Sequence, residues 1–306
     1  MIYDTIILGS GPAGLAAAIY TSRANLKTLI IGGDLPGGQL MLTTTVEDYP
    51  GFSNGIQGPD LMKEMIEQAK KMGSELITGN ATSVNFSQKP FIINSGDKKY
   101  QTRSVIIATG SSAKWLGLAS EKKLTGKGVS ACAVCDGAFF KDKDIVVIGG
   151  GDTAMREAIF LTKYAKSVKV IHRRDSLRAF PILQDRAFKN KKISFVWDTV
   201  AEEFLGEKIL EGVKVKNVKT GKQLTIRCQG AFVAIGHKPN TDFLKGHIKL
   251  DKKGYIITKD EVKTGVPGIF AAGDVHDIKY KQASTAAGSG TKAALEIDSF
   301  LENGST

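Results

Sequence analysis

Two glycine-rich turns, each set between a buried strand and a helix, constrain the fold of this chain more than any other feature. In the first unit, residues 2–8 form an apolar strand, GSGPAG follows at 9–14, residues 15–23 favour a helix, and residues 27–31 form a second strand. Gly9 permits the tight turn, Gly11 lets a pyrophosphate approach the backbone, and Gly14 lets helix and strand pack closely. The unit therefore predicts a doubly wound α/β domain that binds a dinucleotide at the helix N-terminus.

The second unit repeats this order. An apolar strand at 145–148 precedes GGGDTA at 149–154, a helix is predicted from about Met155 to Tyr164, and the next strand spans 168–171. Three arginines follow that strand, where an NAD site would place a carboxylate: Arg173, Arg174 and Arg178. Because guanidinium groups match a phosphate, the cluster favours the 2′-phosphate of NADPH over a solvated basic loop. His172 is expected to be a packing or hydrogen-bonding neighbour.

In the first unit the acidic residue for the ribose is missing. It should fall near Ile31 or Gly32, and only Asp34 is close, so Asp34 is either a ribose ligand or a turn residue.

The two halves also end alike, with an apolar strand and a glycine at 104–110 and again at 231–236, which predicts two related nucleotide-binding domains. The remaining tail holds one short strand, 269–271, followed by Gly273-Asp274, and it is too short for a domain of its own. We therefore expect the first domain to comprise 1–113 and 240–306, with the second, 114–239, inserted into it.

Cys132-Ala-Val-Cys135 is followed directly by Asp136-Gly137. As a structural staple the pair would close only a short loop, for which chain entropy gives about 2 kcal/mol. A zinc site needs about four ligands, and the one further cysteine is Cys228. Two free core cysteines are a third alternative. The adjacent carboxylate and flexible turn favour redox chemistry of a dithiol and a disulfide.

The composition is that of a globular protein, with 306 residues, 42% hydrophobic and 24% charged. No run approaches the roughly 18 apolar residues of a membrane helix, and no cleavable leader is evident, so we expect a cytoplasmic protein without a membrane partner. In that compartment a C-x-x-C pair is more often catalytic than structural. The net charge of +11 comes from lysines scattered along the chain, and no nucleic-acid motif accompanies them. A solvated surface is therefore the favoured interpretation, and the excess would also speed encounter with an acidic protein partner or anionic cofactors.

Taken in this order, the motifs resemble the bacterial-type, low-molecular-weight thioredoxin reductases, class II pyridine nucleotide-disulfide oxidoreductases, over essentially the full chain. Residues 130–137 and 172–178 are the most specific part of the resemblance. It implies two Rossmann-like domains, the NADPH domain being inserted into a discontinuous FAD domain. It also implies a homodimeric enzyme, thioredoxin-disulfide reductase, that passes electrons from NADPH through FAD and a Cys132–Cys135 disulfide to thioredoxin.

The resemblance assigns site residues as well. Cys135 would face the flavin, Cys132 would attack the thioredoxin disulfide, and Asp136 would be the acid that handles thiol protons. No metal is expected. The residues assigned to FAD are Gly9, Gly11, Pro12, Ala13, Gly14, Gly38, Gln39, Asp48, Gly273, Asp274, Lys281, Gln282 and Ala283. Those assigned to NADPH are Gly149, Gly151, Asp152, Thr153, Arg173, Arg174 and Arg178.

Two positions depart from the family pattern, since Asp48 stands where Asn is common and Lys281 where Arg is common. Lysine keeps the charge but lacks the planar fork of arginine. The domains are expected to rotate about connections near 111–115 and 237–241, so that the flavin meets the disulfide and the nicotinamide in turn.

The alternative functions are a related flavoprotein reductase with another acceptor, ferredoxin or a peroxidase-linked protein, and a non-enzymatic nucleotide-binding redox sensor. The ferredoxin-type relatives lack the cysteine pair, and the peroxidase-linked ones carry an extra N-terminal thiol domain.

Overall fold

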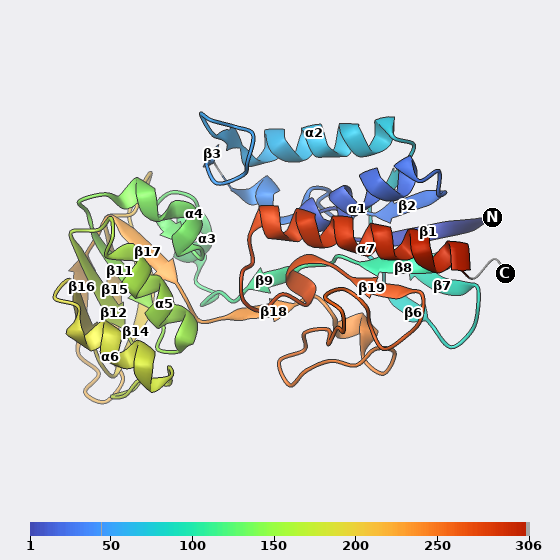
Figure 1. Ribbon diagram of the computed structural model, residues 1–306. Coiled ribbons are helices and arrows are strands. Elements are labelled where there is room, and N and C mark those ends of the chain that lie inside the picture. The colour runs from blue at the N-terminus through green and yellow to red at the C-terminus, as the bar shows by residue number, and fades with distance from the viewer. Residues whose placement is uncertain (44, 304–306) are drawn as a thin grey trace. The chain divides into compact units, whose positions relative to one another are not determined.

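The computed structural model describes residues 1–43 and 45–303, which divide into two compact units (Figure 1). One unit is discontinuous and comprises Met1–Ser112 together with the chain from Lys238 onward. The other unit comprises Ala113–His237. None of the described helices has the length and apolarity that a membrane crossing requires.

The discontinuous unit is built on a seven-stranded sheet in the order β5-β2-β1-β8-β7-β6, with β19 also paired to β8. Its central strands are parallel, and Ile7 of β1 lies opposite Ile30 of β2 and Ile106 of β8. Ile106 also pairs with Phe270, so the C-terminal segment contributes a strand to the N-terminal sheet. The strands are β1 (Ile2–Leu8), β2 (Thr28–Ile31), β5 (Glu75–Ile77), β6 (Ser83–Asn85), β7 (Phe91–Ser95), β8 (Lys98–Ile107) and β19 (Ile269–Ala271).

Both faces of this sheet are covered, which explains the continuous apolar runs of its parallel strands. Successive side chains of a strand point to opposite faces of the sheet. On one face, Ile7 packs with α1 (Pro12–Arg23), α2 (Gly58–Lys71) and α7 (Ala283–Asn303), which are labelled in Figure 1. Ile6 and Leu8 point the other way and pack with Phe86, Phe91 and Leu244.

The second unit contains a five-stranded parallel sheet in the order β10-β17-β11-β12-β13, and a three-stranded antiparallel sheet of β14, β15 and β16. Its strands are β10 (Val129–Ser130), β11 (Asp144–Ile148), β12 (Ser167–Ile171), β13 (Ile193–Val196), β14 (Thr199–Leu205), β15 (Gly212–Asn217), β16 (Gln223–Arg227) and β17 (Gly230–Val233). Its helices are α3 (Ala119–Leu124), α4 (Ala133–Asp136), α5 (Asp152–Leu161) and α6 (Pro181–Lys189).

Short elements complete both units, and the chain passes between the units through two strands that pair with each other, β9 (Ser111–Ala113) and β18 (His237–Pro239). The others are β3 (Thr45–Val46), β4 (Ile56–Gln57) and the 3₁₀ turns η1 (Gly38–Leu42), η2 (Gly137–Phe140), η3 (Asp242–Leu244) and η4 (Gly273–Val275).

The predicted strand at 269–271 is confirmed, whereas both glycine-turn helices begin earlier than predicted. α1 begins at Pro12, because proline suits the first helical position, where its missing N–H would have no partner. α5 begins at Asp152 rather than Met155, because the turn is complete at Gly151. It ends at Leu161 rather than Tyr164, because the amides that follow donate hydrogen bonds to carbonyls three residues earlier. Lys163 N donates to Phe160 O, and Tyr164 N donates to Leu161 O.

Candidate functional site

The first glycine turn is packed tightly at its two ends and open in its middle. A Cβ on Gly9, whose φ is +109°, would overlap the Ala108 carbonyl, and a Cβ on Gly14 would overlap the Gly9 carbonyl. At Gly11, by contrast, no described atom beyond its chain neighbours and the backbone of α1 lies within 4 Å of the Cβ position. Gly11 is also the N-cap of α1 and provides no side-chain cap. Backbone amides therefore face an open cradle that suits a pyrophosphate.

Loop residues from far along the chain border this turn. Ser10 Oγ donates to Gly32 O at 2.6 Å and accepts from Gly37 N at 2.9 Å, which draws the 37–39 segment toward the turn. A Cβ on Gly38 would lie 3.4 Å from Gly11 Cα. Gln39 Nε2 donates to the Ser111 carbonyl. Gly38 thus lies beside the first glycine turn, and Gln39 is bonded to the start of β9.

Asp34 and Asp48 have different surroundings from these loop residues. Asp34 accepts a hydrogen bond from Asn80 Nδ2 at 2.6 Å, which ties its loop to the residues after β5. Asp48 is exposed in the loop between β3 and β4. The structure therefore provides a turn role for Asp34.

The C-terminal tail reaches the same turn. A Cβ on Gly273 would lie 2.9 Å from Ala13 Cβ, so η4 packs on the first turn of α1. Burial raises the pKa of the neighbouring Asp274 to about 6, and the Lys281 ammonium opposes this shift. Lys281 has a φ of +53°, and its Nζ donates to Tyr255 OH at 2.7 Å. Long-range packing therefore joins Gly273 and Asp274 to the turn, and Tyr255 is a member of this cluster that no sequence motif indicated.

The second glycine turn has the same open centre. At Gly151, the N-cap of α5, no described atom beyond its chain neighbours and the backbone of α5 lies within 4 Å of the Cβ position. The loop carrying the arginines is anchored to this turn, because Arg178 N donates to Gly150 O at 2.7 Å. Asp152 Oδ1 accepts from Phe180 N at 2.8 Å and secures the end of that loop. The structure therefore places the arginine cluster beside the predicted phosphate cradle.

The three arginines of this loop are exposed and make no ion pair within the described residues. Asp175, the acid between them, is bound to Lys219 at 3.0 Å, which lowers the pKa of its carboxyl. His172 is buried with its ring against Gly150, and burial lowers its pKa. Its Nε2 lies 3.1 Å from Ser176 O, so His172 acts as a packing and hydrogen-bonding neighbour. Three guanidinium groups thus remain free to bind a phosphate.

Cys132 and Cys135 form a disulfide with their Cα atoms 5.4 Å apart. Cys132 caps α4, and its Sγ accepts from Cys135 N at 3.2 Å. Asp136 N donates to Cys132 O at 3.2 Å. Cys135 is exposed and Cys132 half-buried, so partner molecules in solution have access to the pair.

The third cysteine has a different environment. Cys228 is buried with 1% of its surface exposed, and burial raises the pKa of its thiol to about 12. A thiol of this kind is inert near neutral pH. Among the described residues no group of three or more His, Cys, Asp and Glu side chains could hold a metal ion.

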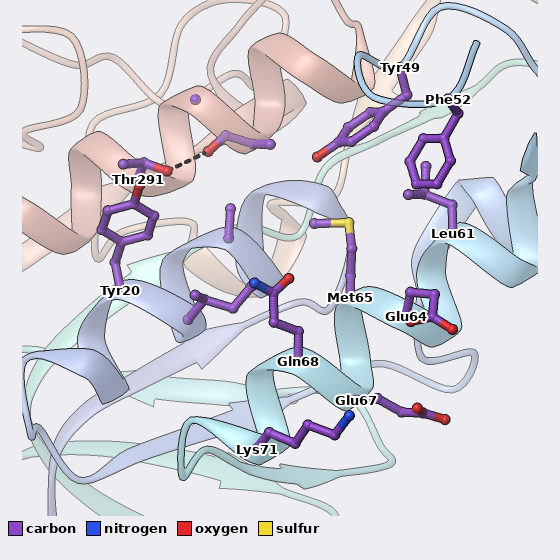
Figure 2. A pocket seen from close by; sticks show the side chains of 14 residues that line it. Tyr20, Tyr49, Phe52, Leu61, Glu64, Met65, Glu67, Gln68, Lys71 and Thr291 are labelled. Carbon is purple, nitrogen blue, oxygen red and sulfur yellow. Dashed lines mark hydrogen bonds between the residues drawn. The ribbon is translucent and has the colours of Figure 1, made fainter. Parts of the chain in front are cut away.

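A cavity of about 540 Å³ in the discontinuous unit was not indicated by any motif (Figure 2). It lies among α1, α2, α7 and the loop at 49–52, and burial raises the pKa of Tyr49 on its wall. Its lining includes Tyr20, Tyr49, Phe52, Leu61, Met65 and Thr291. None of the residues assigned to a cofactor lines it.

Comparisons with known proteins agree along nearly the whole chain. The family model for pyridine nucleotide-disulphide oxidoreductases matches residues 3–290. The chain is 54% identical over 301 residues to the thioredoxin reductase of Rickettsia conorii, covering 97% of each chain. It is 49% identical to the thioredoxin reductase of Streptomyces coelicolor, covering 98% of this chain and 94% of the relative. The crystal structure of thioredoxin reductase from Streptococcus pyogenes superimposes with a TM-score of 0.94 at 45% identity, covering 99% of each chain.

Proposed function

The chain belongs to the pyridine nucleotide-disulphide oxidoreductase family as a thioredoxin reductase of the bacterial type, and from this premise we propose which of its residues carry electrons from NADPH to a thioredoxin disulfide. Membership implies a flavin and NADPH in general. The observation that carries the assignment is the accessible Cys132–Cys135 disulfide within a unit that also holds a phosphate cradle and free arginines. Ferredoxin or a peroxidase-linked protein as acceptor, and a non-enzymatic sensor, are not favoured.

The flavin we propose is FAD, held by the discontinuous unit. The open cradle at Gly11 and the close packing at Gly9 and Gly14 support a pyrophosphate there. Gly38 and Gln39 from one loop and Asp274 from the tail would border the remainder of the cofactor. A flavin bound there supplies two-electron transfer between the nicotinamide and the disulfide. The further residues proposed for this site are Pro12, Ala13, Asp48, Gly273, Lys281, Gln282 and Ala283.

NADPH would bind the second unit. Gly149, Gly151, Asp152 and Thr153 would hold its pyrophosphate at the N-terminus of α5. Arg173, Arg174 and Arg178 would bind the 2′-phosphate, and the pairing of Asp175 with Lys219 supports this, because it removes the competing carboxylate.

The thiol chemistry would be divided between the two sulfurs. Reduction of the disulfide by two electrons and one proton gives one thiol and one thiolate. Cys132 would use its thiolate to attack the thioredoxin disulfide, and the Cys135 N–H that reaches its sulfur supports this role. Cys135 would then attack the mixed disulfide and release reduced thioredoxin, while Asp136 would supply a proton to the leaving thiolate. The Cys132→Ser variant described below tests this division between the two sulfurs.

We also propose, from the family resemblance, a homodimer in the cytoplasm with thioredoxin as its protein substrate. Analytical ultracentrifugation of the purified enzyme measures the first of these properties directly.

The deciding experiment is a coupled assay with NADPH, thioredoxin and the purified yellow protein. Cys132→Ser should keep flavin bleaching by NADPH and lose thioredoxin reduction. Cys228→Ala serves as the control, because it removes the buried thiol and should retain both reactions. Thioredoxin reduction by Cys132→Ser would show that the role of Cys132 is wrong, and no reduction by the wild type would refute the proposed function.

A further inference from the structure

Lys219 joins two carboxylates of the second unit and belongs to no motif. Its Nζ lies 3.0 Å from Asp175 Oδ2 and 3.0 Å from Asp198 Oδ2. Asp175 lies 44 residues earlier, in the loop that carries the three arginines, whereas Lys219 lies in the turn between β15 and β16. One ammonium group thus connects the antiparallel sheet to the loop that is proposed to bind the 2′-phosphate.

Hydrogen bonds hold the backbone around Lys219 in place. Asn217 Oδ1 accepts from Lys219 N at 3.0 Å and from Thr220 N at 2.9 Å, which fixes the turn. Val218 N donates to Asp198 O at 2.6 Å, so the turn is docked on the connection between β13 and β14. The side chain of Lys219 therefore extends from a fixed backbone that lies beside one of its two carboxylate partners.

The connection that carries Asp198 is bonded in turn to the loop of arginines. Asp198 N donates to Arg174 O at 3.1 Å. Arg174 is the residue directly before Asp175. A continuous set of contacts therefore leads from the turn at Lys219 to the backbone beside Asp175, and the ion pair closes this set through the side chains.

The ion pair between Lys219 and Asp175 is too exposed to do much for the stability of the fold. The two side chains are 59% and 69% exposed, and ion pairs of this kind contribute little because water and salt screen them. The side chain of Asp198 is only 17% exposed, and its backbone is bonded on both sides. Loss of the Lys219 ammonium would therefore release the Asp175 carboxylate, whereas Asp198 would remain in place.

A released Asp175 carboxylate would weaken phosphate binding in two ways. Because it is next to Arg174 in the chain, it can pair with a guanidinium group and occupy donors that a phosphate needs. Its negative charge also repels the phosphate. A 2′-hydroxyl would not suffer in this way, since a carboxylate after this strand is the group that binds the ribose hydroxyls in NAD sites. Release of Asp175 would therefore disfavour NADPH specifically.

We propose that Lys219 is a positioning residue that sets the preference for NADPH, an inference that rests on the proposed function. Lys219 holds the Asp175 carboxylate and thereby keeps the guanidinium groups of Arg173, Arg174 and Arg178 available to the 2′-phosphate. It acts through Asp175 and does not itself contact the cofactor.

Binding of two nucleotides to the flavin-loaded enzyme tests this role without turnover. Adenosine 2′,5′-bisphosphate carries the 2′-phosphate and 5′-AMP lacks it, so the ratio of their dissociation constants in isothermal titration calorimetry reports on that phosphate. Lys219→Met should weaken binding of the bisphosphate by about three- to fivefold at low salt and leave 5′-AMP unchanged. Lys219→Arg keeps the charge and should retain most of the preference. Lys222→Met is the matched control, because it removes an exposed lysine from the same hairpin.

Asp175→Asn distinguishes a role through Asp175 from a direct contact with phosphate. It replaces the carboxylate with a neutral amide, so adding Lys219→Met to Asp175→Asn should cause no further loss of bisphosphate binding. The same loss in that background would show that Lys219 binds the phosphate itself. Equal weakening of both nucleotides by Lys219→Met would show a purely structural role. Either result would overturn the inference.

The wild type separates this inference from the proposed function. If it prefers the bisphosphate and Lys219→Met shows the same preference, the inference is wrong and the proposed function stands. If the wild type has no such preference, the assignment of NADPH is wrong as well. Lys219→Gln takes the place of Lys219→Met if that variant does not fold, and the same loss is expected from it.

Discussion

Removing one guanidinium from the arginine loop should change the choice of cofactor without harming the fold. Arg174 is exposed and makes no ion pair among the described residues, so Arg174→Ala removes no contact that stabilises the unit. One charge-assisted hydrogen bond to a phosphate contributes about 1.5 kcal/mol at an exposed site. Its loss should lower kcat/KM for NADPH by about tenfold. Arg173→Ala/Arg174→Ala together should lower it by up to about 100-fold, with less than full additivity if both groups bind one phosphate.

The measurement is the ratio of kcat/KM for NADPH to that for NADH, from steady-state bleaching and thioredoxin reduction. NADH lacks the 2′-phosphate, so its kcat/KM should stay constant. Arg186→Ala is the control, since Arg186 is exposed on α6 of the same unit and lies outside the loop. The interpretation is refuted if wild-type enzyme uses NADH as well as NADPH, or if Arg174→Ala lowers both values equally.

The remaining predictions concern the flavin site. Gly11→Ala and Gly14→Ala form a contrasting pair. A Cβ at Gly14 would overlap the Gly9 carbonyl, so Gly14→Ala should destabilise the fold by about 1–3 kcal/mol in urea denaturation. Gly11→Ala should leave stability unchanged and weaken FAD binding at least about tenfold in a fluorescence titration. Equal stability losses for both variants would contradict the open cradle. Burial raises the pKa of Asp274 to about 6 from an ordinary value of 3.8, so the native state keeps a proton that the unfolded chain releases. The free energy of unfolding of the flavin-free protein should therefore fall by up to about 3 kcal/mol as the pH rises from about 4 to 6. Asp274→Asn should abolish this fall. If the variant shows the same fall, Asp274 is not the group that causes it.

Local patterns in the sequence were sufficient to predict the elements around the two glycine turns. A buried parallel strand needs a continuous apolar run, and a pyrophosphate turn needs glycines at set positions, so β1 with its turn and β11 with its turn were predictable from short segments. The strand at 269–271 was also predicted at its observed bounds. The ends of helices were less well determined by the sequence. The end of α5, for example, depends on which carbonyls accept hydrogen bonds from its last amides.

Contacts between distant segments could not be obtained in this way. Gly273 lies against Ala13, and Lys281 donates to Tyr255, only because β19 joins the N-terminal sheet and carries the tail with it. Neither Tyr255 nor the cavity lined by Tyr49 and Phe52 belongs to a motif. Side chains from separate elements meet there through packing, which has no signature in any one segment.

Glu157 shows the same division most clearly. The sequence by itself determined that α5 follows a glycine-rich turn and that a thiol pair precedes β11, since both are local patterns. Only the tertiary structure decided that Oε2 of Glu157, on α5, is shielded from water and has no hydrogen-bond partner among the described residues. The physical reason is that the ionisation of a carboxyl depends on the solvent and charges around it, and packing between helices, rather than neighbouring residues in the sequence, sets both.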